Sequence, residues 1–212
     1  MKELRLILMA VFMVFAMNTQ AQKNEIKTIF GNKEVAKGGF GSMSIAFQPE
    51  MFGRQVYFTG FRGGWIMNHW MSFGLGGYSL TSTVRRDLGW SGSNPRSLSL
   101  YMTYGGFYIE STLMPKFPVH VSFPFLLGGG GAIYIDETFF WDPEIGFSYK
   151  REDSDMFLVI EPGINLELNF VKNLRFGIGV NYRLVEDLKL YETESNAFNG
   201  LSYSFTIKLG KF

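Results

Sequence analysis

The chain has 212 residues, a formal net charge of +1, 25 glycines, 22 phenylalanines and no cysteine. The lack of cysteine excludes a disulfide scaffold, a thiolate zinc site, a cysteine nucleophile and a lipid-anchored N-terminal cysteine. The near-neutral charge argues against a nucleic-acid-binding protein, which is normally basic, and a hydrophobic content of 46% excludes a disordered chain.

Residues 1–21 have the pattern of a secretory signal peptide. Lys2 and Arg5 make the start basic, and the 12-residue apolar run Leu6–Met17 leads to a cleavage site after Ala21. This run is too short to span a bilayer as a helix, and no later run reaches 18 apolar residues. A buried N-terminal helix is the alternative. The mature chain is therefore either a soluble exported protein or a membrane barrel.

Residues 22–36 form a polar lead-in, and from residue 37 the sequence alternates with a period of two, which is typical of β-strands. The pattern is clearest from Met156 to Phe170, where the even positions are apolar and the odd positions turn polar from Glu161. We expect eight strands, near residues 37–48, 55–67, 71–82, 98–114, 119–127, 154–170, 174–186 and 201–209.

The connections between these strands alternate in length. The tight ones lie at residues 68–70, 114–117 and 171–173. The long polar ones lie at residues 85–96, 137–153 and 186–199. An even strand number, with short turns at one end and long loops at the other, is typical of an outer-membrane barrel. We therefore predict an all-β fold over residues 37–212, an eight-stranded antiparallel transmembrane up-and-down β-barrel.

The two faces of the strands favour a membrane barrel over a soluble one. The larger aliphatic and aromatic residues share one face, and the other face carries glycine, serine, threonine, asparagine and charges. That arrangement suits a lipid-facing exterior and a narrow, filled interior. An aromatic girdle is expected near the tight turns, from Trp65, Trp70, Phe117, Phe123, Phe170 and Phe176. A soluble secreted β-sandwich or lipid-binding barrel remains the alternative.

The signal peptide, the eight alternating strands, the short turns and the terminal aromatic residue resemble the OmpA/OmpX-like barrel class of Gram-negative bacteria. The end of the chain, Gly200 to Phe212, looks like the C-terminal signal that the barrel-insertion machinery reads. The resemblance implies a monomer in the lipid of the bacterial outer membrane. It implies no activity, because folds of this kind host different functions.

Strand parity points ten polar side chains into the barrel. They are Arg62, Glu110, His120, Glu161, Asn165, Glu167, Arg175, Asn181, Arg183 and Lys208. An unpaired charge in a narrow interior is costly, so we expect these side chains to form a network that plugs the barrel. A hairpin centred on Lys172 places Glu161 opposite Arg183 and Glu167 close to Arg175. A gate or narrow ion path is the alternative.

The long loops carry aromatic residues that we expect at the outer surface. They are Trp90, Phe139, Phe140 and Trp141. Exposed aromatic side chains mark partner or carbohydrate surfaces, but the favoured alternative for these four is that they pack on one another or dip into the outer leaflet. The most favoured role is structural or surface interaction with an extracellular ligand through loops 85–96, 137–153 and 186–199. A narrow pore for small solutes is the second candidate.

Enzymatic candidates are few. The pair His120 and Ser122 looks like the His-x-Ser pair of lipid A deacylase barrels, and a serine nucleophile would also need an orienting acid. That family acts near the outer leaflet, whereas His120 follows a tight turn, so a lipid-modifying enzyme is the least favoured reading. Two histidines without cysteine argue against a metal site. Glycine runs at 38–41 and 128–131 more plausibly relieve crowding than bind phosphate, so we expect no cofactor.

Overall fold

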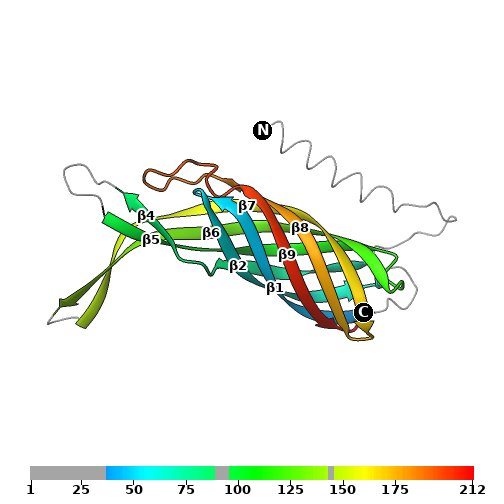
Figure 1. Cartoon of the computed structure of the whole chain (residues 1–212). Coiled ribbons are helices and arrows are strands. Elements are labelled where there is room, and N and C mark those ends of the chain that lie inside the picture. Colours follow the sequence, from blue (N-terminus) through cyan, green and yellow to red (C-terminus); the bar gives the residue numbers. More distant parts are fainter. Residues whose placement is uncertain (1–36, 89–95, 143–145) are drawn as a thin grey trace, which may run out of the picture. The chain divides into compact units, whose positions relative to one another are not determined.

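The computed structural model describes residues 37–88, 96–142 and 146–212, which form one antiparallel sheet (Figure 1). Its strands are β1 (Lys37–Met51), β2 (Arg54–Met67), β3 (Met71–Leu80), β4 (Val84–Leu88), β5 (Arg96–Leu113), β6 (Val119–Asp142), β7 (Gly146–Val171), β8 (Leu174–Glu186) and β9 (Gly200–Gly210). Within these ranges no helix has the length and hydropathy needed to cross a membrane.

The sheet closes on itself. The first strand pairs with the last, from Phe40 opposite Gly210 to Phe47 opposite Tyr203. The barrel also closes through β5, which pairs first with β3 and then with β4. Residues 81–83 separate β3 from β4, so these two strands occupy one position in the barrel as a single interrupted strand. Nine strands therefore make eight barrel positions. The predicted eight-stranded antiparallel barrel is confirmed.

The alternation in the sequence decides which side chains face out. Exposed fractions of the outward-facing Ile45, Phe61, Phe107 and Leu158 lie between 53% and 71%, whereas inward-facing Arg183 is 1% exposed. The closed ladder gives the backbone hydrogen-bond partners without leaving a sheet edge, as a strand structure in lipid requires. An apolar exterior around a charged interior is the transmembrane arrangement and the reverse of a soluble barrel.

Three connections are tight and lie at one end of the barrel, which we call the turn end. They are residues 68–70, 114–118 and 172–173. Trp65, Phe117 and Phe170 are each at least 60% exposed near these turns, as expected for an aromatic girdle. We call the opposite end the loop end. It holds a two-residue turn at Phe52 and Gly53, where both φ angles are positive, as a type I′ hairpin turn requires.

The prediction of a long loop over residues 137–153 is wrong. Strands β6 and β7 continue through most of that range as a paired hairpin, with Phe140 opposite Ser148 and Trp141 opposite Phe147. The polar composition of this segment predicts a loop. A hairpin outside the membrane can carry polar side chains and still form the hydrogen bonds between its two strands. Residues 85–88 of the predicted loop 85–96 likewise belong to β4, and residues 89–95 lie outside the described ranges.

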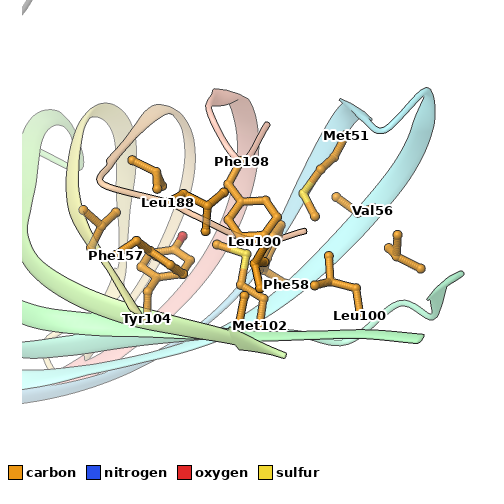
Figure 2. Close-up of a cluster of buried hydrophobic side chains, with 14 of the residues drawn as sticks. Met51, Val56, Phe58, Leu100, Met102, Tyr104, Phe157, Leu188, Leu190 and Phe198 are labelled. Atoms are coloured by element: carbon orange, nitrogen blue, oxygen red, sulfur yellow. The ribbon is translucent and has the colours of Figure 1, made fainter. Parts of the chain in front are cut away.

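The connection from β8 to β9, residues 187–199, folds back into the loop end of the barrel. Figure 2 shows Leu188, Leu190 and Phe198 among inward-facing side chains of the strands, and their exposed fractions are 3%, 4% and 0%. The expectation that this polar loop simply faces outward is therefore wrong. Removal of these three apolar side chains from water stabilises the folded-back position of the loop. We call this segment the plug.

Two cross-strand glycine pairs let neighbouring strands approach closely. Gly64 lies opposite Gly74, and a Cβ added to Gly64 would lie 2.1 Å from the Phe73 carbonyl oxygen. Gly106 and Gly128 form a similar pair, in which a Cβ on Gly128 would lie 2.1 Å from a backbone oxygen. Within the run 128–131, Gly128 and Gly130 therefore relieve crowding in a strand, as the sequence indicated, whereas a Cβ at Gly131 would make only an ordinary contact at 3.7 Å.

Candidate functional site

The barrel interior brings together all ten polar residues that strand parity pointed inward. None of them is more than 6% exposed. They come from β2, β5, β6, β7, β8 and β9 and form clusters at different levels of the barrel. Tyrosines and the plug complete these clusters.

The cluster nearest the turn end is built on two carboxylates. Lys208 Nζ donates to Glu110 Oε1 at 2.5 Å and to Glu167 Oε1 at 2.6 Å. Glu167 Oε2 also lies 3.7 Å from Arg175 Nη1 and 3.2 Å from His120 Nε2. The expected proximity of Glu167 and Arg175 is therefore present. Each carboxylate has a cationic partner, which is what a buried charge requires.

Ser122 and Asn165 extend this cluster. Ser122 Oγ donates to Glu167 Oε1 at 3.0 Å, and Asn165 Nδ2 donates to Ser122 Oγ at 3.4 Å. His120 and Ser122 thus both contact the carboxylate of Glu167. A nucleophile in a His-x-Ser pair needs its hydroxyl directed at the histidine that takes its proton, whereas the Ser122 hydroxyl donates to the Glu167 carboxylate. The geometry of this pair gives no support to the deacylase-like arrangement.

Arg62 lies between two tyrosines in the middle of the barrel. Its Nη1 donates to the Tyr108 hydroxyl at 3.3 Å and its Nη2 donates to the Tyr78 hydroxyl. Its guanidinium carbon is 5.2 Å and 4.7 Å from the centroids of the Tyr78 and Tyr108 rings. Tyr108 also donates to Glu110, so Tyr108 connects Arg62 to the carboxylates at the turn end.

Arg183 organises the cluster nearest the loop end. Its Nη1 donates to the Tyr104 hydroxyl at 3.1 Å, and Tyr104 donates to Glu161 Oε2 at 2.5 Å. Ile160 pairs with Leu184 and Gly163 with Asn181, so the register on either side puts Glu161 across from Arg183, as the sequence predicted. The contact between them passes through Tyr104. Arg183 also donates to Gln48 and, at 3.0 Å, to the carbonyl oxygen of Phe198 in the plug.

The remaining predicted interior residue, Asn181, donates through Nδ2 to Ser204 Oγ at 3.1 Å. Sequence reasoning missed the roles of Gln48, Tyr78, Tyr104 and Tyr108. All four occupy inward positions of the same alternation, so parity could have found them. Tyrosine was read as part of the apolar face, although its hydroxyl usually finds a polar partner when the ring is buried.

The plug is fixed by hydrogen bonds as well as by its apolar side chains. Arg86 on β4 donates to the Thr193 hydroxyl at 2.8 Å and to the Glu192 carbonyl oxygen at 2.9 Å. On the opposite side of the plug, Asp155 Oδ2 accepts from the backbone N–H of Lys189 at 2.5 Å. A hydrogen bond from Lys189 to Asp187, 2.9 Å long, raises the pKa of Lys189 at the surface.

The structure describes the four aromatic residues predicted at the surface only in part. Trp90 lies outside the described residues. The backbone of Phe139, Phe140 and Trp141 lies in β6, and their side chains are outside what the structure describes. Among the described side chains, no group of three or more histidines and carboxylates is arranged to hold a metal ion.

The sequence matches no protein-family model and no curated protein. Among solved structures it is similar to Neisserial surface protein A, with a TM-score of 0.48, 12% identity and coverage of 85% of this chain and 100% of that one. It is also similar to the N-terminal barrel domain of Pseudomonas aeruginosa OprF, with a TM-score of 0.45, 8% identity and coverage of 84% and 99%. For Ail of Yersinia pestis the TM-score is 0.37, the identity 13% and the coverage 82% and 95%.

The chain's own geometry, rather than these distant likenesses, establishes its fold. Strand pairing closes the barrel, the exterior is apolar, and the interior is filled with paired charges. The chain has the fold of a small eight-stranded outer-membrane β-barrel.

Proposed function

We propose that the protein is an occluded outer-membrane barrel that acts through the surface of its loop end. The observation that carries this proposal is the double filling of the interior. Paired charges occupy the part nearer the turn end, and an apolar core that includes the plug occupies the part nearer the loop end (Figure 2). Because the interior is filled, it is closed to solutes. Only the outer surface of the strands and the connections between them are then available to a partner.

The orientation follows from the lengths of the connections. Short turns of outer-membrane barrels face the periplasm and longer segments face outward. The loop end therefore lies at the cell surface. The exit of β9 at the turn end, close to the start of β1, supports contact of the last strand with the insertion machinery during assembly. A closed barrel leaves no sheet edge that needs a second copy, which supports a monomer.

The described residues of the loop end are held in place by strand pairing and by packing. The β6–β7 hairpin continues the barrel wall outward, the β4–β5 pair does the same, and the plug packs against residues of both, including Val84, Leu98 and Tyr134. Segments held by strand pairing cost a partner less conformational entropy on binding than free loops do. We therefore favour recognition of an extracellular partner over transport.

Attachment of living cells tests the surface role. Cells that export the wild type should attach to a solid or host surface better than cells that export a variant with residues 137–150 replaced by a two-residue turn. The control is the heat-dependent gel mobility of both proteins, which shows that each barrel is folded in the membrane. Equal attachment by two equally folded barrels would contradict the proposal.

A further inference from the structure

The turn end of the barrel contains a cavity of about 640 Å³. Its walls are the connections between β2 and β3, between β5 and β6 and between β7 and β8, together with the residues after β9. The interior clusters described above lie on one side of it. The other side opens to the compartment that the short turns face.

The lining of this cavity carries positive charge. Lys116, Lys172, Arg175 and Lys211 all contribute to it, and no aspartate or glutamate side chain does. Within the described part of the chain, the three lysines form no ion pair. Arg175 is already paired with Glu167, so the three lysines carry the excess positive charge. An anion bound between them would lower their mutual repulsion.

Arg175 is the buried member of this set. Its exposed fraction is 5%, and its guanidinium carbon lies 3.9 Å from the centroid of the Phe212 ring. One terminal nitrogen lies 3.7 Å from Glu167, but Nε is buried without any hydrogen-bond partner. Nε of Arg62, in the packed middle of the barrel, is unpartnered in the same way. What distinguishes Arg175 is its place in the lining of the cavity, where its guanidinium can meet an acceptor.

We propose that this cavity binds a phosphate group, with Arg175 as the buried donor and Lys116, Lys172 and Lys211 as the surrounding cations. A guanidinium presents a planar set of donors that suits phosphate oxygens, and lysines add mobile point charges. A phosphate group presents more acceptor oxygens to such a set than a carboxylate does, both as a doubly charged monoester and as a singly charged diester. The group could belong to a soluble periplasmic compound or to a phospholipid headgroup, and both present the same chemistry.

The test is saturable stabilisation by phosphate. The full mature chain is refolded in a zwitterionic detergent, and its urea unfolding midpoint is measured as inorganic phosphate replaces chloride at constant ionic strength. Phosphate should raise the midpoint with a hyperbolic dependence on concentration. Phosphatidylglycerol in mixed micelles is titrated in parallel. A stronger effect of the lipid assigns the group to a headgroup, and a stronger effect of inorganic phosphate assigns it to a soluble compound.

Variants separate a site from a general charge effect. The double variant Lys116→Gln with Lys172→Gln removes two exposed turn cations, and it should raise the apparent Kd for phosphate at least tenfold. Arg175→Gln should abolish saturation, and the lysine variant still decides the question if Arg175→Gln does not fold. Lys189→Gln, at the loop end, should leave the apparent Kd unchanged. A linear response in the wild type, or equal responses in the lysine variant and the Lys189 control, would overturn the proposal.

Discussion

At the scale of single residues, Lys208 joins two carboxylates that have few other cationic partners. It donates to Glu110 and Glu167 at 2.5 and 2.6 Å and is 4% exposed. A buried pair contributes little net stability compared with an apolar replacement of both partners, but removal of one partner leaves the other uncompensated. The interior is therefore more sensitive to single changes than to matched ones.

Lys208→Met should lower the free energy of unfolding by about 3–5 kcal/mol, because it leaves buried carboxylates without their shared cation. Urea unfolding in detergent measures this change. Lys189→Met is the matched control, since its side chain is 75% exposed and its pair with Asp187 lies at the surface. A loss of less than about 1 kcal/mol for Lys208→Met, the range of surface pairs, would contradict the burial argument.

Glycine positions give a second prediction at this scale. Gly64→Ala should destabilise the barrel by about 1–3 kcal/mol, because the added Cβ meets backbone atoms of β3 that cannot move without disturbing the ladder. Gly41→Ala should change stability little, because nothing lies within 4 Å of a Cβ there. Equal effects of the two substitutions on the unfolding midpoint would show that strand approach at Gly64 is not limiting.

At the scale of elements, the features that could be predicted are those that depend on the alternation of apolar and polar residues along a strand. Strand positions, the register of the β7–β8 hairpin and the inward direction of ten polar side chains all follow from a local period of two. The plug and the length of the β6–β7 hairpin do not follow from it. Leu188, Leu190 and Phe198 become buried only through contacts with distant strands. In the β6–β7 hairpin, polar residues outside the membrane have the composition of a loop although they form strand pairs.

The plug also provides a prediction of its own. Leu190→Asn should release residues 187–199, because it removes about 2–3 kcal/mol of apolar burial and leaves an amide in an apolar core. Limited proteolysis of the unheated barrel should then cut within this segment. Lys189→Asn changes the adjacent exposed residue and should leave the segment resistant. Cleavage at equal rates in both variants would mean that apolar packing does not hold the plug.

At the scale of the whole molecule, two kinds of filling occupy one narrow barrel. The charged part could be predicted from strand parity, but Tyr78, Tyr104 and Tyr108, which connect its clusters, are missing from the predicted interior residues. The apolar part could not, because the same residue types also face the lipid, and only the fold separates them. The two parts meet where Arg183 contacts both Tyr104 and the plug carbonyl of Phe198.

Ion conductance tests the central claim of an occluded barrel most directly. The wild type is incorporated into a planar bilayer, and heat-dependent gel mobility of the same preparation shows that the inserted protein is folded. We expect no resolved current steps, and none after Leu190→Asn, because the paired charges nearer the turn end remain in place. Discrete steps in the wild type, with amplitudes altered by Glu161→Gln or Arg183→Gln, would contradict the account and establish a narrow pore.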